Sequence, residues 1–419
     1  MDDRGHVYDM PVREFRGDPP ALPESAVFRT RLPGGELVWA VRGYDGVRTA
    51  LSHPSLARDV TAGTPELGAA GPMGEGVLRD RTLLLDGPPH TQLRNLTAKP
   101  LTARRVTALR PRVQELTDGL LDALEESGPP AGLVPGLSLP LPITVICEIL
   151  GVPARDNVRF RRWADRMAAI GEAPQDEAMS ALLDVLAHLE RHLEEKRAHP
   201  GDDLLSAWLA AQEGDDRLTD AEIVQLALSI LLAGYECTAG AIAASVWRLL
   251  RHPDQLRALR SEPELIPNAV QELIGYQTPA LLFRVLVARE DFGLGGTAVR
   301  RGDSVMPLTW AANRDPAPFK DPGRFGIRHR GNAHLVYGQG PHRYLGAALA
   351  TAELEIAISG LLHRMPGLRP AAPLDTLDRC TDRLPRRRAP DTARSVARAP
   401  DGDPVDGPYD ENCLISRTP

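Results

Sequence analysis

TDAEIVQLALSILLAGYECTAGAIAASVWRLL, residues Thr219 to Leu250, is the stretch that decides the architecture of this chain. It opens with a T-x-x-E pair, Thr219 and Glu222, which is the signature of a capping box at a helix start. The apolar run continues for about thirty residues, roughly 45 Å of helix at 1.5 Å per residue. A helix this long and apolar nearly all round is expected to cross the middle of a large domain. Gly234 at its centre lowers helix stability by about 1 kcal/mol relative to alanine. Its presence indicates that another part of the protein packs closely against the backbone there.

The segments around this helix predict a mostly helical domain with a minor sheet, because apolar residues recur at helical spacing in most of them. Helices are expected at 44–51, 102–124, 143–150, 156–170, 175–198, 263–276 and 346–362, and strands at 36–41, 281–287 and 304–308. Residues 1–35 are rich in Pro and Gly and are expected to form an irregular lead-in, and residues 61–76 a loop. After about Arg386 the composition predicts a disordered tail. We therefore expect one domain over residues 1–385 and a tail over 386–419.

Composition and charge exclude several classes of protein. The chain has 419 residues, 42% of them hydrophobic, and a net charge of −7, which argues against a nucleic-acid-binding surface. Its four cysteines lie far apart and form no CxxC pair, so we expect neither a disulfide scaffold nor a metal site. The N-terminus has no apolar signal segment, and no run of 18 apolar residues occurs. These features predict a cytoplasmic protein without a membrane span.

Five segments, in order, resemble soluble bacterial cytochromes P450 and cover roughly residues 25 to 370. They are DGPPHTQLRNLTAKPLTARRV (86–106), LPLPITVICEILGVP (139–153), LLAGYECTAG (231–240), QELIGY (271–276) and HLVYGQGPHRYLGAALATAELE (334–355). The resemblance implies the P450 fold, which is mainly α with minor β and has a long central helix. In the family, the last segment is the haem-binding loop and the segment at 231–240 is the oxygen-binding stretch of the central helix.

The haem-binding loop departs from the family at its most important position. The family reads F-G-x-G-x-H-x-C-x-G, whereas here Tyr344 stands where the resemblance places the cysteine that ligates haem iron. That thiolate donates electron density to iron and favours O–O cleavage. A tyrosine has a pKa near 10 and offers a hard oxygen instead of soft sulfur. Its ring also projects farther than a cysteine sulfur, into the space that the porphyrin would occupy.

Two further motifs of the family are altered. In the E-x-x-R motif Glu272 remains but Gly275 replaces the arginine. A buried carboxylate needs a partner, and Arg324 is the candidate. In the central helix Glu236 matches the family's acid, whereas Cys237 replaces the threonine that helps to deliver protons to bound oxygen.

Four residues stand where the family contacts the haem propionates: His90, Arg94, Arg284 and His342. They can persist as contacts between helices or on the surface. Alternatively they bind residual haem b or another anionic ligand, because several such groups facing one cavity are costly without an anion.

These departures favour a protein without catalytic residues, metal or bound cofactor. Cysteine-less P450 relatives include auxiliary proteins that bind and activate deoxysugar glycosyltransferases in antibiotic biosynthesis, and this chain resembles them. We therefore expect a glycosyltransferase as its partner. Three alternatives stay open. The first is a haem-binding P450-family oxidoreductase with Tyr344 in place of the thiolate, where Arg343 is the only basic group of the loop that could lower the phenol pKa. The others are a haem-free enzyme that uses Glu236 as acid or base, and a module that recruits a carrier-bound substrate.

Overall fold

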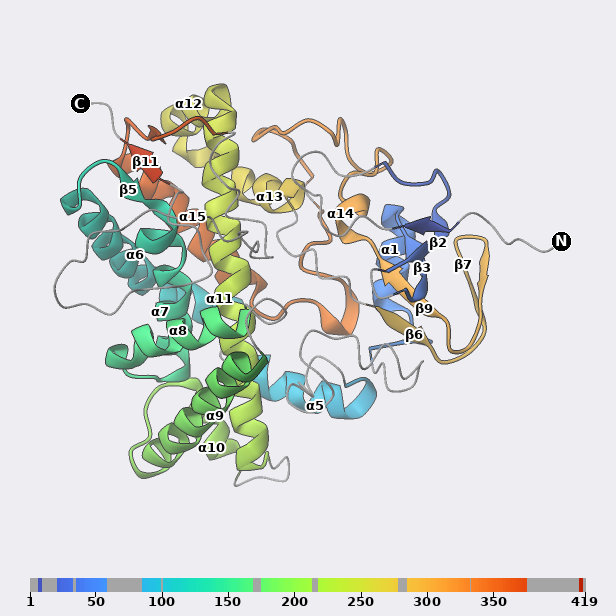
Figure 1. Cartoon of the computed structure of the whole chain (residues 1–419), viewed down its shortest axis with the longest axis horizontal. Coiled ribbons are helices and arrows are strands. Elements are labelled where there is room, and N and C mark those ends of the chain that lie inside the picture. Colours follow the sequence, from blue (N-terminus) through green and yellow to red (C-terminus); the bar gives the residue numbers. More distant parts are fainter. Residues whose placement is uncertain are drawn as a thin grey trace, which may run out of the picture.

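The computed structural model describes residues 7–9, 21–32, 35–58, 85–98, 101–168, 175–212, 218–277, 285–331, 333–374 and 414–416. Most helices gather on one side of the molecule and the main sheet lies on the other, with α11 running the length of the helical part (Figure 1). The α-helices are α1 (Tyr44–Ser52), α5 (Gly87–Ala98), α6 (Ala103–Glu126), α7 (Pro140–Leu150), α8 (Asn157–Ala168), α9 (Gln175–Ala198), α10 (Leu204–Ala211), α11 (Asp220–Arg251), α12 (Pro253–Ser261), α13 (Ile266–Gln277), α14 (Thr309–Ala312) and α15 (Ala347–Arg364).

The main sheet has six strands in the order β1-β2-β3-β9-β6-β4. They are β1 (Tyr8–Asp9), β2 (Val27–Arg31), β3 (Leu37–Val41), β4 (Leu56–Ala57), β6 (Leu286–Ala288) and β9 (Ser304–Pro307). A three-stranded sheet joins β10 (Arg369–Pro370), β11 (Leu414–Ser416) and β5 (Ala131–Gly132), and a hairpin joins β7 (Phe292–Leu294) to β8 (Thr297–Val299). The antiparallel pairing of β2 with β3 is one correction to the sequence analysis, because β2 lies inside the expected irregular lead-in.

The long central helix confirms the central prediction. Thr219 accepts a hydrogen bond from the backbone of Glu222, and the Glu222 side chain accepts one from the Thr219 backbone, so the capping box is complete. By length and composition α11 could cross a membrane, but 56% of its most apolar window is buried inside the fold. Burial of this extent is expected of a helix in the core of a domain.

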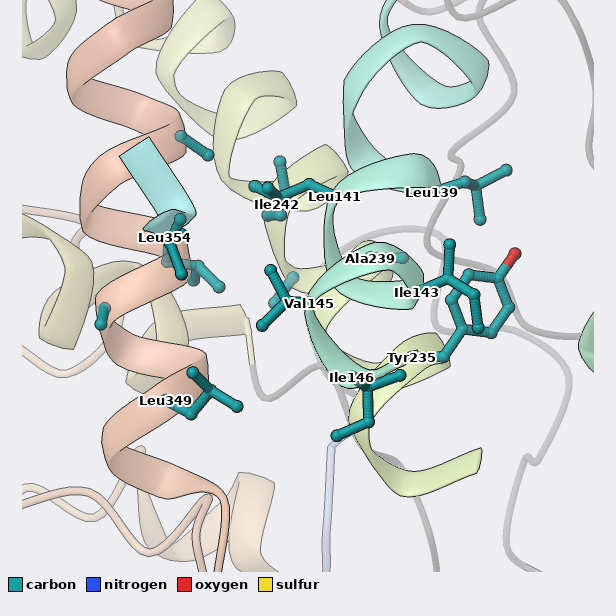
Figure 2. Packing of buried hydrophobic residues seen from close by; sticks show 14 of the residues in the cluster. Leu139, Leu141, Ile143, Val145, Ile146, Tyr235, Ala239, Ile242, Leu349 and Leu354 are labelled. Carbon is teal, nitrogen blue, oxygen red and sulfur yellow. The ribbon is translucent and has the colours of Figure 1, made fainter. Parts of the chain in front are cut away.

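Close packing on α11 explains the central glycine. Figure 2 shows Ile143 and Ile146 of α7 near Tyr235 of α11, whereas Val145 projects toward Leu354 of α15. A Cβ built on Gly234 would lie 3.0 Å from Cδ1 of Ile146, which is tighter than an ordinary van der Waals contact. The glycine therefore lets α7 approach the backbone of α11. The expected close contact at this position is made by the Ile146 side chain.

Several other expectations are confirmed, and some elements were missed. The predicted helix at 175–198 coincides with α9, and the predicted strand at 36–41 matches β3. Helices α10, α12 and α14 were not predicted. The loop at 61–76 and most of the predicted tail lie outside the described residues. Leu414–Ser416, which fall within that tail, form β11 instead of a disordered segment.

Candidate cofactor site

The loop before α15 has a tightly fixed backbone. Gly338 and Gly340 have φ values of 70° and 73°, in the left-handed region that favours glycine. A Cβ on Gly340 would lie 2.9 Å from Cβ of Ser52, so this loop also packs closely on the end of α1. The backbone N–H of Tyr344 donates to the carbonyl of Tyr337 (2.7 Å) and closes the loop on itself.

The side chain of Tyr344 leaves this loop and reaches the central helix. Its hydroxyl donates to the backbone carbonyl of Ala233 on α11 (3.1 Å). Its ring stacks on Tyr337, with ring centroids 6.0 Å apart and an interplanar angle of 24°. The Tyr337 hydroxyl is in turn hydrogen-bonded to Thr351 Oγ1 on α15 (2.9 Å). Burial raises the pKa of Tyr344 far above its usual value of 10, so the phenol is protonated in this structure.

The face of α11 near Tyr344 differs from the rest of the helix. In the middle of α11 Leu231, Tyr235, Thr238 and Ala239 are buried, whereas several other residues, among them Ala233, Glu236, Cys237 and Gly240, are partly accessible. Their spacing of three or four residues places them on one face. The structure thus brings the predicted oxygen-activation positions Glu236 and Cys237 to the same side of α11 as the carbonyl that binds Tyr344.

Cationic side chains gather beside the loop, on α5 and on the segment after β4. The rings of His90 and His342 stack with centroids 3.9 Å apart, and Arg94 donates to the carbonyl of Arg343. Arg58, which the sequence analysis missed, is buried and interacts electrostatically with His90. The structure therefore unites three of the four predicted propionate positions. Arg284 lies outside the described residues.

The electrostatics of this group favour an anion. The pKa of His90 is lowered to about 4, first by burial and then by the charges of His342, Arg94 and Arg58. The carboxylate of Asp86, which sequence reasoning also missed, accepts hydrogen bonds from His342 Nε2 (3.0 Å) and from the backbone of Arg58 (2.8 Å). The pKa of Asp86 is lowered by these contacts although burial opposes the shift. The cluster can bind a carboxylate or phosphate and would be stabilised by it.

In the altered E-x-x-R motif, the carboxylate of Glu272 is paired with groups other than the expected arginine. Glu272 accepts hydrogen bonds from His329 Nδ1 and from the backbone of Gly326, both at 3.0 Å. The expected pairing with Arg324 is therefore wrong, although Arg324 lines the same cavity of about 320 Å³. A Cβ on Gly275 would lie 3.1 Å from Cβ of His334, so the imidazole packs where a longer side chain would have projected.

Comparison with known proteins agrees with this geometry. A family model for cytochrome P450 matches residues 173–365. Nocardicin C N-oxygenase of Nocardia uniformis subsp. tsuyamanensis is 41% identical over 367 residues, which cover 85% of this chain and 89% of that protein. The chain belongs to the cytochrome P450 family. The P450 monooxygenase PikC of Streptomyces venezuelae is also 41% identical, over 82% of each chain. The solved structure of the P450 hydroxylase LnmA from Streptomyces atroolivaceus superposes with a TM-score of 0.78 at 39% identity, over 89% of this P450 and 96% of LnmA.

These relatives correct the functional expectations. They are named as monooxygenases, hydroxylases and an N-oxygenase, and they point to catalytic oxidation with haem as the cofactor. The expectations of a non-catalytic glycosyltransferase activator, of a protein that is not an enzyme and of a chain without a cofactor are therefore wrong. The open alternative of a haem-binding P450-family oxidoreductase agrees better with the relatives. The glycosyltransferase partner stays a prediction.

The residues of this P450 fit haem only in part. The cluster of Arg58, His90, Arg94 and His342 suits the two carboxylates of a haem. Residue 344 does not fit in the conformation described here, because its hydroxyl is already hydrogen-bonded to Ala233 across the space between the loop and α11. It also offers a protonated phenol instead of a thiolate.

Proposed function

We propose that this chain is a haem-dependent oxidoreductase of the P450 family that modifies a bacterial secondary metabolite, and that carries Tyr344 at the position of the family's thiolate. The cationic cluster beside the loop is the observation that carries the proposal. It retains the guanidinium groups of Arg58 and Arg94, which can neutralise haem carboxylates, and the imidazole of His90, whose pKa is lowered to about 4 by burial and neighbouring positive charges and which can donate a hydrogen bond in its neutral form. Haem supplies one-electron and oxygen chemistry when it is bound.

The substrate class rests on the relatives. Their names refer to nocardicin C, mycinamicin IV and 6-deoxyerythronolide B. We therefore propose an antibiotic-type metabolite as substrate. Glu236 and Cys237 lie on the accessible face of α11. We propose them as the candidate residues for proton transfer in this chain. A carboxylic acid and a thiol can each hold a proton at that face.

The cluster provides the first test. The chain is expressed with a haem precursor, and the ratio of haem to protein is measured from the Soret band and from total iron. Arg94→Gln is expected to lose most of the bound haem, because a hydrogen bond to a charged group is worth about 1.5–3 kcal/mol. Arg105→Gln is the matched control, since Arg105 forms an exposed ion pair with Asp202 at 2.8 Å. Equal haem content in both variants would contradict the assigned role of the cluster.

The second test addresses the reaction. Haem-loaded protein is supplied with a ferredoxin, its reductase and NADPH, or with hydrogen peroxide, and incubated with a panel of macrolide, β-lactam and terpenoid metabolites. We expect a product heavier than its substrate by one oxygen atom, detected by mass spectrometry. Failure of every metabolite with a fully loaded protein would count against oxidation as the function.

A further inference from the structure

Tyr344 projects from a part of the chain that has little freedom to move. Its backbone N–H is held by Tyr337, and the carbonyl of the preceding residue, Arg343, accepts a hydrogen bond from Arg94 on α5. Tyr337 is itself attached to α15 through Thr351. We therefore expect a change at this position to be a rotation of the Tyr344 side chain about a loop that these hydrogen bonds hold in place.

The direction of the side chain is equally well defined. A Cβ on Gly346 would lie 2.8 Å from the hydroxyl oxygen of Tyr344 and 2.9 Å from its Cζ. The phenol thus folds over Gly346, in the space that the missing Cβ leaves free, and ends on the carbonyl of Ala233. The contact joins the loop directly to the partly accessible face of α11.

This contact has a consequence for any planar cofactor. The resemblance to cytochromes P450 places the porphyrin between the loop and the central helix. While Tyr344 is hydrogen-bonded to Ala233, no gap remains between residue 344 and that turn of α11. The phenol and the cofactor therefore compete for one space.

We infer that Tyr344 gates the cofactor site: its phenol closes the space between the loop and α11, and haem enters only as the phenol leaves Ala233. This inference rests on the proposed function. The same hydrogen bond stabilises the protein before haem binds, since it satisfies the hydroxyl and ties two elements together. The cluster of Arg58, His90, Arg94 and His342 lies beside the same loop, where Arg94 is bound to the carbonyl of Arg343 and His342 to Asp86.

The test compares haem binding and stability in the full chain prepared without haem. Hemin is titrated and followed at the Soret band, and the melting temperature of the unloaded protein is measured separately. Tyr344→Phe removes only the hydroxyl, and Tyr344→Ala removes the whole phenol. Tyr276→Phe is the matched control, because the Tyr276 hydroxyl also donates to a backbone carbonyl, that of Gly323 (3.0 Å), away from the loop.

We expect Tyr344→Phe to bind hemin about tenfold more tightly than wild type, equivalent to about 1.4 kcal/mol, and Tyr344→Ala more tightly still. Both should lower the melting temperature of the unloaded protein, and Tyr276→Phe should leave hemin affinity unchanged. Equal hemin affinity in wild type and Tyr344→Phe would overturn the gate alone. Weaker binding by Tyr344→Phe would overturn it in favour of a phenolate ligand. No stoichiometric binding by any variant, Tyr344→Cys included, would overturn the proposed function together with the gate.

Discussion

Glu353 on α15 leads to a prediction with a defined dependence on pH. Its side chain is 2% exposed, and Oε2 has no hydrogen-bond partner among the described residues. Burial raises the pKa of this carboxyl from its ordinary value of 4.5 to about 8. A raised folded-state pKa contributes stability that is fully present below the unfolded value and is lost as the pH rises through the folded value.

The size of the effect follows from these two values. Between pH 4.5 and pH 8 the wild-type chain loses about 1.4 kcal/mol of unfolding free energy for each pH unit. At pH 7 the accumulated loss is about 3 kcal/mol. Glu353→Gln has nearly the same shape as the protonated acid but cannot ionise, so this loss is absent in the variant. A constant offset from the new amide does not affect the slope.

Urea denaturation from pH 5 to pH 8 measures the difference in unfolding free energy between Glu353→Gln and wild type. We expect that difference to rise in favour of the variant by about 2–3 kcal/mol between pH 5 and pH 7. Glu355→Gln is the control on the same helix, where Glu355 forms an ion pair with Arg110 at 2.9 Å. Its effect should stay within about 1 kcal/mol. A flat or falling difference for Glu353→Gln would show that the carboxyl is ionised in the folded protein.

Three further substitutions test the packing around the site. Gly234→Val should destabilise the chain by about 1–3 kcal/mol through overpacking against Ile146, measured by urea denaturation, and an unchanged midpoint would refute the close contact. His329→Ala should lower the free energy of unfolding by about 1–3 kcal/mol, because the buried Glu272 loses a hydrogen-bond partner. A melting temperature equal to that of wild type would show that this pair does not stabilise the protein. Thr219→Ala should lower the free energy of unfolding by about 1 kcal/mol through loss of the helix cap. An unchanged melting temperature would contradict a stabilising role of the capping box.

The central helix could be predicted from sequence because its signals are local. A capping box, a long and largely apolar run and a terminating His-Pro pair define α11 without reference to any other segment. The same holds for α9 and β3, whose patterns match their structures closely. By contrast, β2 was missed because its five residues follow a Pro-rich stretch and become a strand by pairing with β3 and β1. Such pairing is set by distant residues that local propensity does not include.

For the site, too, some features could be predicted from the sequence and others could not. The sequence by itself determined which residue stands at each position of the P450 motifs, including Tyr344, Gly275 and Cys237, since identity at an aligned position needs no coordinates. Only the tertiary structure decided what those residues contact: the hydroxyl of Tyr344 on the carbonyl of Ala233, and Glu272 on His329 instead of Arg324. These contacts join segments more than fifty residues apart, and their partners are chosen by how whole helices and loops pack. The sequence determines the chemistry of each side chain, whereas the fold determines which group that side chain contacts.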